Sequence, residues 1–355
     1  MVNYLDSRRI AGTTAERSSI PSSATTGGWV ELGRTTLGSP ATTIDVSSLA
    51  NKRYLMVLYN NIDNGTNTHF VVNQYGNSSV DTGSNYSERR SQNGGADATG
   101  TSQTYINTSG GDQVVPEFIV QYIANYASKE KLIMSHSVGA QADGAGTAPN
   151  RRESVGKWAN TSNPIDVIRA NTAFGSRSYG TGSEVVVLGW DPSDTHTTNF
   201  WEELADVTLS SANSNLSSGT FTAKKYLWVQ IYCIPSTSTY GKIQFNNDTG
   251  SNYAYRENTN GAGDTTGTSV AQFYPTNVSA ENKFINMFII NNASNEKLSI
   301  AHCVDASSAG AGNAPIRRES VNKWANTSSQ ITEIDLNANA GTWGTGSFIK
   351  VWGSD

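Results

Sequence analysis

The sequence predicts an all-β protein: two tandem jelly-roll-like β-sandwich domains preceded by an extended N-terminal arm. Three observations lead to this fold class. Gly, Ser, Thr and Asn are abundant whereas charged residues make up only 15% of the chain, which is typical of short strands joined by polar turns. Short apolar and aromatic runs recur between those turns. The chain also contains a long internal repeat, and the repeated unit is large enough to hold a core of its own.

The repeat is clearest in one twelve-residue segment, which we call the twin stretch. It reads RRESVGKWANTS from Arg151 to Ser162, and it recurs from Arg317 to Ser328 with Asn322 in place of Gly156. The two copies lie 166 residues apart, from residue 153 to residue 319. A match of this length and composition indicates a duplicated domain.

The chain begins with a segment unlike either repeat, residues 1–28, which combines Ser and Thr with basic and apolar residues. Two interpretations stay open: an unstructured leader, or an extended arm that anchors the chain on a partner protein. We favour the arm. The residues expected to contact the partner are Tyr4, Leu5, Arg8, Arg9 and Ile10.

The first repeat spans residues 29–190 and the second 201–355, with a polar linker at 191–200. Each repeat contains about eight strand-like segments bounded by turns rich in Gly and Asn. The spacing between matching segments drifts from 172 to 164 residues, so we expect the insertions and deletions to fall in loops. Matching segments are 52–59 and 224–232, 81–86 and 248–253, 118–126 and 284–292, 144–149 and 310–315, and the closing strands 184–188 and 348–352.

The twin stretch permits two local structures and two roles. It is either one or two helical turns or a loop followed by a strand, and Gly156 favours the second. Its tryptophans, Trp158 and Trp324, are the candidate ligand-binding residues, because exposed indole rings stack on sugars. The competing interpretation, which we favour, is structural: each tryptophan caps a sandwich core and the neighbouring charges pair with one another.

Composition excludes several classes of function. The net charge is −5 and no basic run is longer than Arg-Arg, which argues against a nucleic-acid partner. No apolar run approaches the roughly 18 residues of a membrane span, so we expect no membrane insertion. The N-terminus lacks the apolar core of a signal peptide, which predicts synthesis in the cytoplasm. The two cysteines, Cys233 and Cys303, have no counterparts in the first repeat and are predicted to be buried thiols.

No catalytic or cofactor signature stands out. His136 and His302 occupy equivalent positions, without a nucleophile motif or a set of metal ligands nearby in the sequence, and we interpret them as structural. The Asp-Thr-Gly-Ser-Asn segments and residues 260–264 are predicted to be turns. A calcium loop is the weaker alternative, since neither fits the ligand pattern of such loops. We therefore expect no enzyme activity and no cofactor.

Several strings resemble a module of virion proteins from tailed bacteriophages, marine ones especially. They are FNNDTGSNYAYR at 245–256, the KWANTS of the twin stretch, and GSEVVVLGW at 182–190. The resemblance covers both repeats but not the arm or the linker. It brings no catalytic or ligand residues with it. The first repeat departs from the second at residues 71–76, which puts the equivalence of the two surfaces in question.

The resemblance implies a non-enzymatic virion structural protein, a head decoration or a fibre-like protein, displayed on the particle surface. The arm would dock on the major capsid or tail protein of the same virion. Self-association as a trimer or another symmetric oligomer is expected. The first alternative is a tail protein that binds host surface glycans, and the second is a polysaccharide depolymerase.

Overall fold

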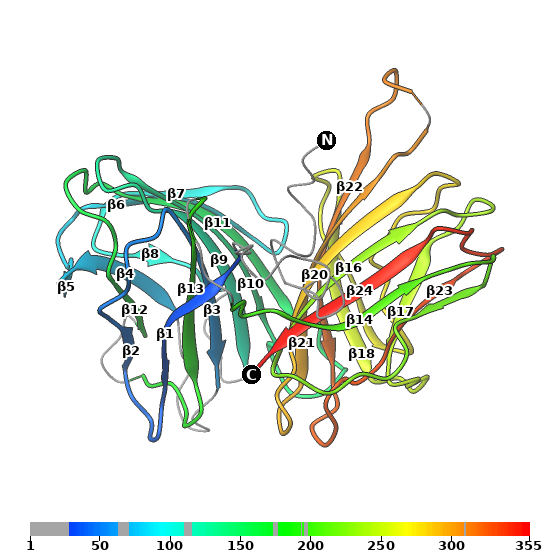
Figure 1. The fold of residues 1–355 in the computed structure, drawn as a ribbon, viewed down its shortest axis with the longest axis horizontal. Helices are drawn as coiled ribbons and strands as arrows, with labels where there is room; N and C mark the ends of the chain where they lie inside the picture. The colour runs from blue at the N-terminus through cyan, green and yellow to red at the C-terminus, as the bar shows by residue number, and fades with distance from the viewer. Residues whose placement is uncertain are drawn as a thin grey trace. The chain divides into compact units, whose positions relative to one another are not determined.

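The protein is all-β, as predicted. The computed structural model describes residues 28–62, 71–109, 116–172, 177–192, 194, 198–308 and 310–355. Over these residues the regular structure consists of antiparallel strands gathered into large and small sheets (Figure 1). No described segment forms a helix long and apolar enough to cross a membrane. Apart from Gly28, the arm lies outside the described residues, including the anchoring candidates Tyr4, Leu5, Arg8, Arg9 and Ile10.

The chain divides into two compact units. Unit 1 runs to Gln141 and resumes from Asn150 to Trp201, and unit 2 comprises Ala142–Pro149 and Glu202–Asp355. The boundary between the repeats therefore falls after Trp201. The eight-residue segment Ala142–Pro149 lies within the first repeat in sequence but belongs to unit 2 by its contacts.

Unit 1 is a sandwich of an eight-stranded and a five-stranded sheet. The large sheet has the order β1-β13-β3-β9-β10-β11-β6-β7, and the small sheet has the order β2-β12-β4-β5 with β8 paired to β4. The strands are β1 Val30–Thr36, β2 Thr43–Val46, β3 Tyr54–Asn61, β4 Val72–Asn77, β5 Ser79–Val80, β6 Tyr86–Gln92, β7 Ala98–Gln103, β8 Ile106–Asn107, β9 Glu117–Ala124, β10 Lys131–Gly139, β11 Asn150–Trp158, β12 Val167–Asn171 and β13 Glu184–Trp190.

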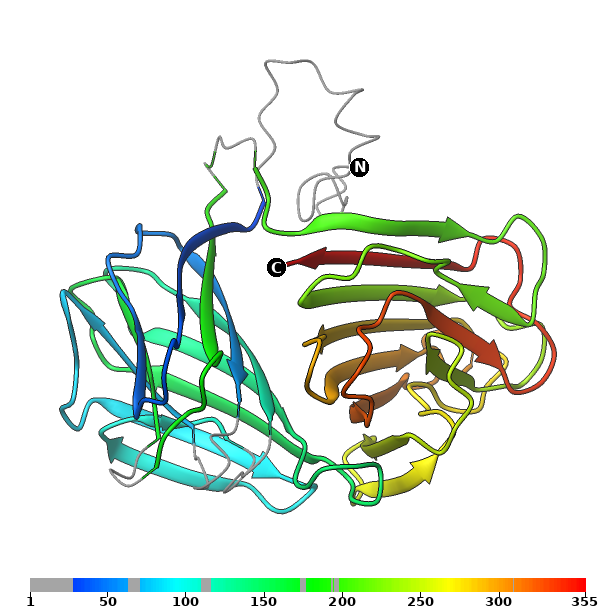
Figure 2. The same ribbon diagram turned by 90° about the horizontal axis from the view of Figure 1, so that it is seen from below.

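Unit 2 repeats this plan with an eight-stranded sheet, β14-β24-β16-β20-β21-β22-β18-β19, and a three-stranded sheet, β15-β23-β17. Figure 2 shows β14 beside the C-terminal strand β24 (red) at one edge of the large sheet. The strands are β14 Glu202–Thr208, β15 Asn215–Ser217, β16 Tyr226–Cys233, β17 Gly241–Phe245, β18 Tyr253–Thr259, β19 Thr265–Val270, β20 Lys283–Ile290, β21 Lys297–Asp305, β22 Ile316–Trp324, β23 Ile334–Ala338 and β24 Phe348–Ser354.

The twin stretch forms strands β11 and β22, so the strand interpretation is confirmed and the helical alternative is wrong. Each strand is held on both sides by antiparallel neighbours, β10 and β6 in unit 1 and β21 and β18 in unit 2. These ladders provide hydrogen-bond partners for the backbone N–H and C=O groups along the whole strand, which an isolated helical turn could not do.

The hydrophobic core of each unit lies between its two sheets. Because successive side chains of a strand point to opposite faces, Ile133 of β10 enters the unit 1 core while its neighbours Leu132 and Met134 point away from it. In unit 2 the core includes Cys233 and Cys303, which are free and buried as predicted.

The hairpins that end the large sheets turn on Asn and Gly, as the composition predicts. Asn93 and Gly94 connect β6 to β7 with φ of 51° and 72°, and Asn260 and Gly261 connect β18 to β19 with φ of 54° and 76°. Two consecutive residues with positive φ match the right-handed twist of the flanking strands. The segment 260–264, the weaker calcium candidate, is part of such a hairpin.

Candidate functional site

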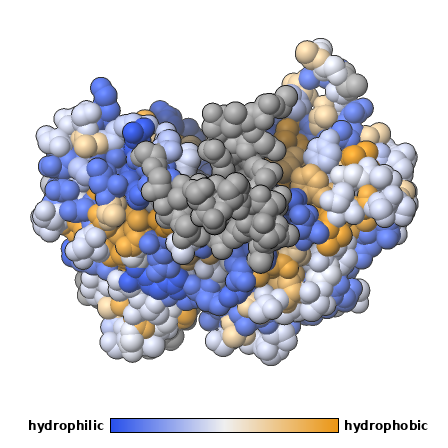
Figure 3. All heavy atoms as spheres, viewed as in Figure 1, coloured by the Kyte–Doolittle hydropathy of each residue, from blue (hydrophilic) through white to orange (hydrophobic). Residues whose placement is uncertain are grey.

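A groove of about 920 Å³ lies on the face of the unit 1 large sheet that points away from the core. Its floor comes from β10 and β11, where Leu132, Met134 and Val155 are exposed at 58%, 55% and 50%. Met134 and Val155 face each other across the ladder, so these side chains form one continuous apolar strip. In Figure 3 apolar patches (orange) appear among the polar side chains of the molecular surface. Exposed apolar strips of this kind mark binding surfaces.

Charged side chains border the apolar floor. Lys157 lines the groove and donates to Glu130 at 3.0 Å, and Arg89 lines it and contacts Asp97 at 3.2 Å. All four side chains are well exposed, so each pair contributes at most about 1 kcal/mol to stability. They are therefore available to interact with a partner molecule.

Glu88 is the one acidic residue among the described residues that line the groove, and it has a structural role. Its carboxylate is paired with Arg90 and accepts a hydrogen bond from the backbone amide of Asn107. Burial raises the pKa of Glu88, and the bond from Asn107 opposes that shift. The carboxylate thus joins the two sheets of unit 1.

The tryptophan of each twin stretch is fastened to an aspartate of a distant turn. Trp158 Nε1 donates to Asp81 Oδ2 at 2.8 Å, and Trp324 Nε1 donates to Asp248 Oδ2 at 2.7 Å. The Asp81 carboxylate also accepts from the Gly83 amide. Burial opposes the shift, but these hydrogen bonds hold the pKa of Asp81 and of Asp248 below its usual value.

The stacking hypothesis for Trp158 and Trp324 is corrected by this geometry. The two residues are 1% and 2% exposed, and a buried lysine lies over each ring, with Lys131 Nζ 5.5 Å and Lys297 Nζ 5.8 Å from the ring centroids. A sugar has no exposed indole face to stack on. The tryptophans therefore have the structural role of the competing interpretation. We call each hydrogen-bonded pair a clasp: the first clasp is Trp158 with Asp81, and the second is Trp324 with Asp248.

A polar hollow of about 400 Å³ lies beside the first clasp. Amide, hydroxyl and carboxylate side chains line it, including those of Asn77, Ser79, Asp81, Asn160 and Asn163. Such groups hydrogen-bond sugar hydroxyls. Because Asp81 already bonds Trp158 and Asn85, its free hydrogen-bonding capacity is reduced.

The histidines of the two repeats lie on equivalent ladder positions, opposite glutamates of the twin stretches. His136 pairs with Glu153 in the β10–β11 ladder, and His302 pairs with Glu319 in the β21–β22 ladder. Burial and the neighbouring Arg151 lower the pKa of His136 to about 4, so its imidazole is neutral near pH 7.

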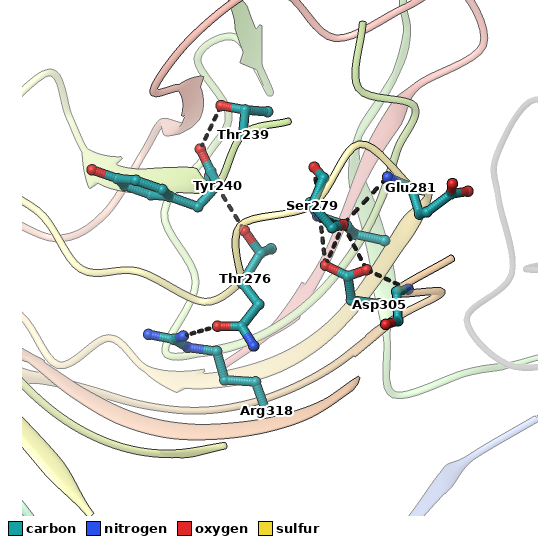
Figure 4. A network of polar contacts seen from close by, with 11 residues as sticks. Thr239, Tyr240, Thr276, Ser279, Glu281, Asp305 and Arg318 are labelled. Carbon is teal, nitrogen blue, oxygen red and sulfur yellow. Dashed lines mark hydrogen bonds and ion pairs between the residues drawn. The ribbon is translucent and has the colours of Figure 1, made fainter. Parts of the chain in front are cut away.

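Unit 2 contains a buried polar cluster that the sequence did not reveal. Lys283 Nζ lies 2.6 Å from Asp305 Oδ2 and donates to Ser279 Oγ at 2.5 Å, while Ser279 Oγ donates to Asp305 at 2.7 Å. Figure 4 shows Ser279 beside Asp305 in this network. A lysine beside a serine can activate a nucleophile, but Asp305 neutralises this lysine and all three side chains are buried. This geometry favours a structural role for the cluster.

The Trp158–Asp81 bond could have been predicted from the sequence, but the Lys283–Asp305 pair could not. The clasp could have been found, because Asp81 and Trp158 both recur in the second repeat as Asp248 and Trp324. The Lys283–Asp305 pair had no such signal, since the first repeat carries Glu117 and Gly139 at the equivalent positions.

No protein-family model and no curated protein matches the chain. Among solved structures, it is similar to mouse laminin alpha1 chain domains LG4-5 at 9% identity, covering 94% of this chain and 92% of that chain with a TM-score of 0.20. It is also similar to a tesB protein of Mycobacterium avium subs paratuberculosis at 6% identity, covering 73% and 79% with a TM-score of 0.12. TM-scores this low carry no conclusion about fold or function.

Proposed function

We propose that this chain is a non-enzymatic building block of a larger protein assembly. The observation that carries the proposal is the unit 1 groove, whose exposed apolar floor is bordered by charged side chains. Protein interfaces have this composition, with an apolar centre and a polar rim. Contiguous exposed apolar side chains such as Leu132, Met134 and Val155 are typical of a surface that another molecule covers.

The assembly we propose is the virion of a tailed bacteriophage, with the chain displayed on the head or tail. The sequence strings given above support this finer statement. The arm of residues 1–28 would fasten the chain to the major capsid or tail protein, and the two sandwiches would project from the particle. Synthesis in the host cytoplasm fits this role.

The test measures incorporation of the protein into particles. Met134→Glu and Val155→Glu place charge on the groove floor, and Val278→Glu makes the same change at an exposed site of unit 2. Mass spectrometry of purified particles should show loss of the groove variants and normal incorporation of Val278→Glu. Deletion of residues 1–28 should also abolish incorporation while leaving both units folded. Normal incorporation of both groove variants would refute the role of the groove.

Binding of host glycans is the second candidate, and the polar hollow beside the first clasp supports it. Asn160→Ala and Asn163→Ala should weaken binding on a glycan array without unfolding the protein, if the hollow is the site. A depolymerase is supported less well. A retaining glycosidase needs two carboxyl groups about 5–5.5 Å apart in a cleft, and the described groove lining offers Glu88 alone, already paired with Arg90.

A further inference from the structure

The segment Ala142–Pro149, which we call the repeat 1 loop, connects β10 to β11 and is docked on unit 2. Three of its bonds reach β22, the residue before β21, and β19 of the large sheet. Lys323 Nζ donates to Ala142 O at 2.6 Å, the Gly144 amide donates to Glu296 Oε1 at 2.5 Å, and the Ser269 amide donates to Ala145 O at 2.8 Å.

A fourth bond completes the docking, from Arg256 Nε to Pro149 O at 2.8 Å. In all four bonds the loop contributes a main-chain atom. These four bonds therefore depend on the backbone conformation of the loop, and the Asp143 carboxylate adds an electrostatic interaction with Lys323. Any loop that follows the same backbone path can make the same bonds.

The second repeat contains such a loop, which we call the repeat 2 loop: Gly310–Pro315 together with Ser308. Its sequence GAGNAP matches GAGTAP of the repeat 1 loop. Its backbone matches too, because Gly144 and Gly310 have φ of 79° and 86°, and the preceding Gln141 and Ser307 have φ of 68° and 65°. The repeat 2 loop is thus already in the conformation that docks.

The two loops differ in exposure. Ala148 and Pro149 of the docked loop are buried, whereas the matching Ala314 and Pro315 are exposed. The repeat 2 loop presents main-chain groups of the docking conformation at the surface.

Unit 1 carries the receiving residues at equivalent positions. Lys157 corresponds to Lys323, and Glu130 corresponds to Glu296. Within unit 1, Lys157 forms an ion pair with Glu130 at 3.0 Å, and within unit 2, Lys323 forms an ion pair with Glu296 at 3.6 Å. The side chains of Lys157 and Glu130 are 42% and 40% exposed, against 0% and 4% for Lys323 and Glu296 beneath the docked loop.

The other two receiving positions also match. Ser102 and Ser269 share an unusual positive φ, 52° and 49°, at the same bulge of the last hairpin. Arg89 corresponds to Arg256, and it is exposed where Arg256 is largely buried. Lys157 and Arg89 both line the apolar groove, so an open copy of the receiving site borders that groove.

We propose that the repeat 2 loop of one copy of this chain docks on the receiving site around Lys157 and Glu130 of unit 1 in a second copy, as the repeat 1 loop docks on unit 2. The proposal rests on the proposed function and names the partner of the groove. The contact is heterologous, since loop and receiving site are different surfaces. Repetition of such a contact builds a ring when the rotation closes and a filament when it does not.

The experiment uses the full chain and two variants, each lacking one of the two surfaces. Lys157→Glu removes the donor of the receiving site. Gly310→Val forces a β-branched residue to φ +86° and disrupts the loop, which is solvent-exposed and outside the core. Lys350→Glu, at a surface ion pair of unit 2, is the matched charge control. Circular dichroism and thermal unfolding confirm that each variant is folded.

Analytical ultracentrifugation over a concentration series should show self-association of the wild-type chain and of Lys350→Glu. Each of the other two variants should associate at least about tenfold more weakly, the loss expected for one charge-assisted hydrogen bond. A mixture of Lys157→Glu with Gly310→Val should form a 1:1 dimer and stop there, because it retains one intact loop and one intact receiving site.

A monomeric wild-type chain, unchanged association of either variant, or a mixture that stays monomeric would overturn the inference. The proposed function fails separately, if the groove-floor variants enter particles normally. A monomeric wild-type chain combined with exclusion of those variants from particles would leave the proposed function standing and point to a different protein as the groove's partner.

Discussion

The clasp between Trp158 and Asp81 makes a quantitative prediction about stability. Trp158→Phe keeps an aromatic ring in the core but removes the Nε1 donor, which lies 2.8 Å from a carboxylate. A hydrogen bond to a charged acceptor contributes about 1.5–3 kcal/mol. The smaller ring adds a cavity in a site where Trp158 is 1% exposed, so the total loss should reach about 2–4 kcal/mol.

A double-mutant cycle separates the hydrogen bond from the cavity. Trp158→Phe, Asp81→Ala and the double variant are compared by urea denaturation followed by circular dichroism, and the coupling free energy should be about 1–2 kcal/mol. The second repeat gives an internal control, because Trp324 and Asp248 form the same bond at 2.7 Å and should show a similar coupling.

The same bond predicts the direction of a pH effect. Since the pKa of Asp81 is lowered in the folded protein, its contribution to stability is present above the unfolded-state pKa of about 3.9 and is lost as pH falls through the folded-state value. Trp158→Phe should reduce this acid dependence. A coupling indistinguishable from zero would refute the clasp. Loss of glycan binding in Trp158→Phe at unchanged stability would return the ring to a stacking role.

Three further predictions concern buried positions. Lys283→Met should lower the free energy of unfolding by about 3–5 kcal/mol, because it leaves the buried Asp305 unpaired. Adding Asp305→Leu should restore most of the lost stability. A larger loss of stability in the double variant would contradict this account. Burial raises the pKa of Cys303 to about 12, so a thiol reagent should modify it only after unfolding, and rapid labelling of the native protein would contradict its burial. Gly156→Ala should lose about 1–3 kcal/mol in thermal or urea unfolding, because its Cβ would stand 2.4 Å from Ile106 Cδ1; full stability would mean that Ile106 moves aside freely.

The two repeats have diverged at buried charged positions. Unit 2 buries Lys283 and Asp305 as an ion pair, whereas the first repeat has Glu117 and Gly139 at these positions. The clasp and the large-sheet strand order are nevertheless the same in both units. The divergence between the repeats therefore includes buried positions, among them residues 71–76 in and beside β4.

Much of the fold could be predicted from local chemistry. Gly and Asn at turn positions, such as Asn93 and Gly94, identify hairpins because few other residues adopt positive φ. Apolar runs of strand length identify β-structure, and because the domain is duplicated, each such segment occurs once in each repeat. The burial of Cys303 followed from its apolar strand.

The groove of unit 1 could be predicted less well from the sequence, for a physical reason. A two-residue period shows that Leu132 and Ile133 point in opposite directions, but not which of them enters the core, because both faces of β10 carry apolar residues. The exposed floor of the groove therefore emerged only when the sheets were paired, whereas the burial of Trp158 agrees with the structural role that the sequence favoured.

Composition and repetition are local properties, so the amino-acid sequence predicts a duplicated β-domain with turns at Asn and Gly. Three features became known only from the folded chain: which strands are neighbours, the hydrogen bond between Trp158 and Asp81, and the place of the repeat 1 loop in unit 2. Each of these depends on contacts between residues far apart in the chain, and the loop is held through main-chain atoms that every residue possesses. The identity of the side chains therefore does not predict that contact. The recurrence of the loop sequence in the second repeat is nevertheless the observation that leads to the proposed contact with a second copy.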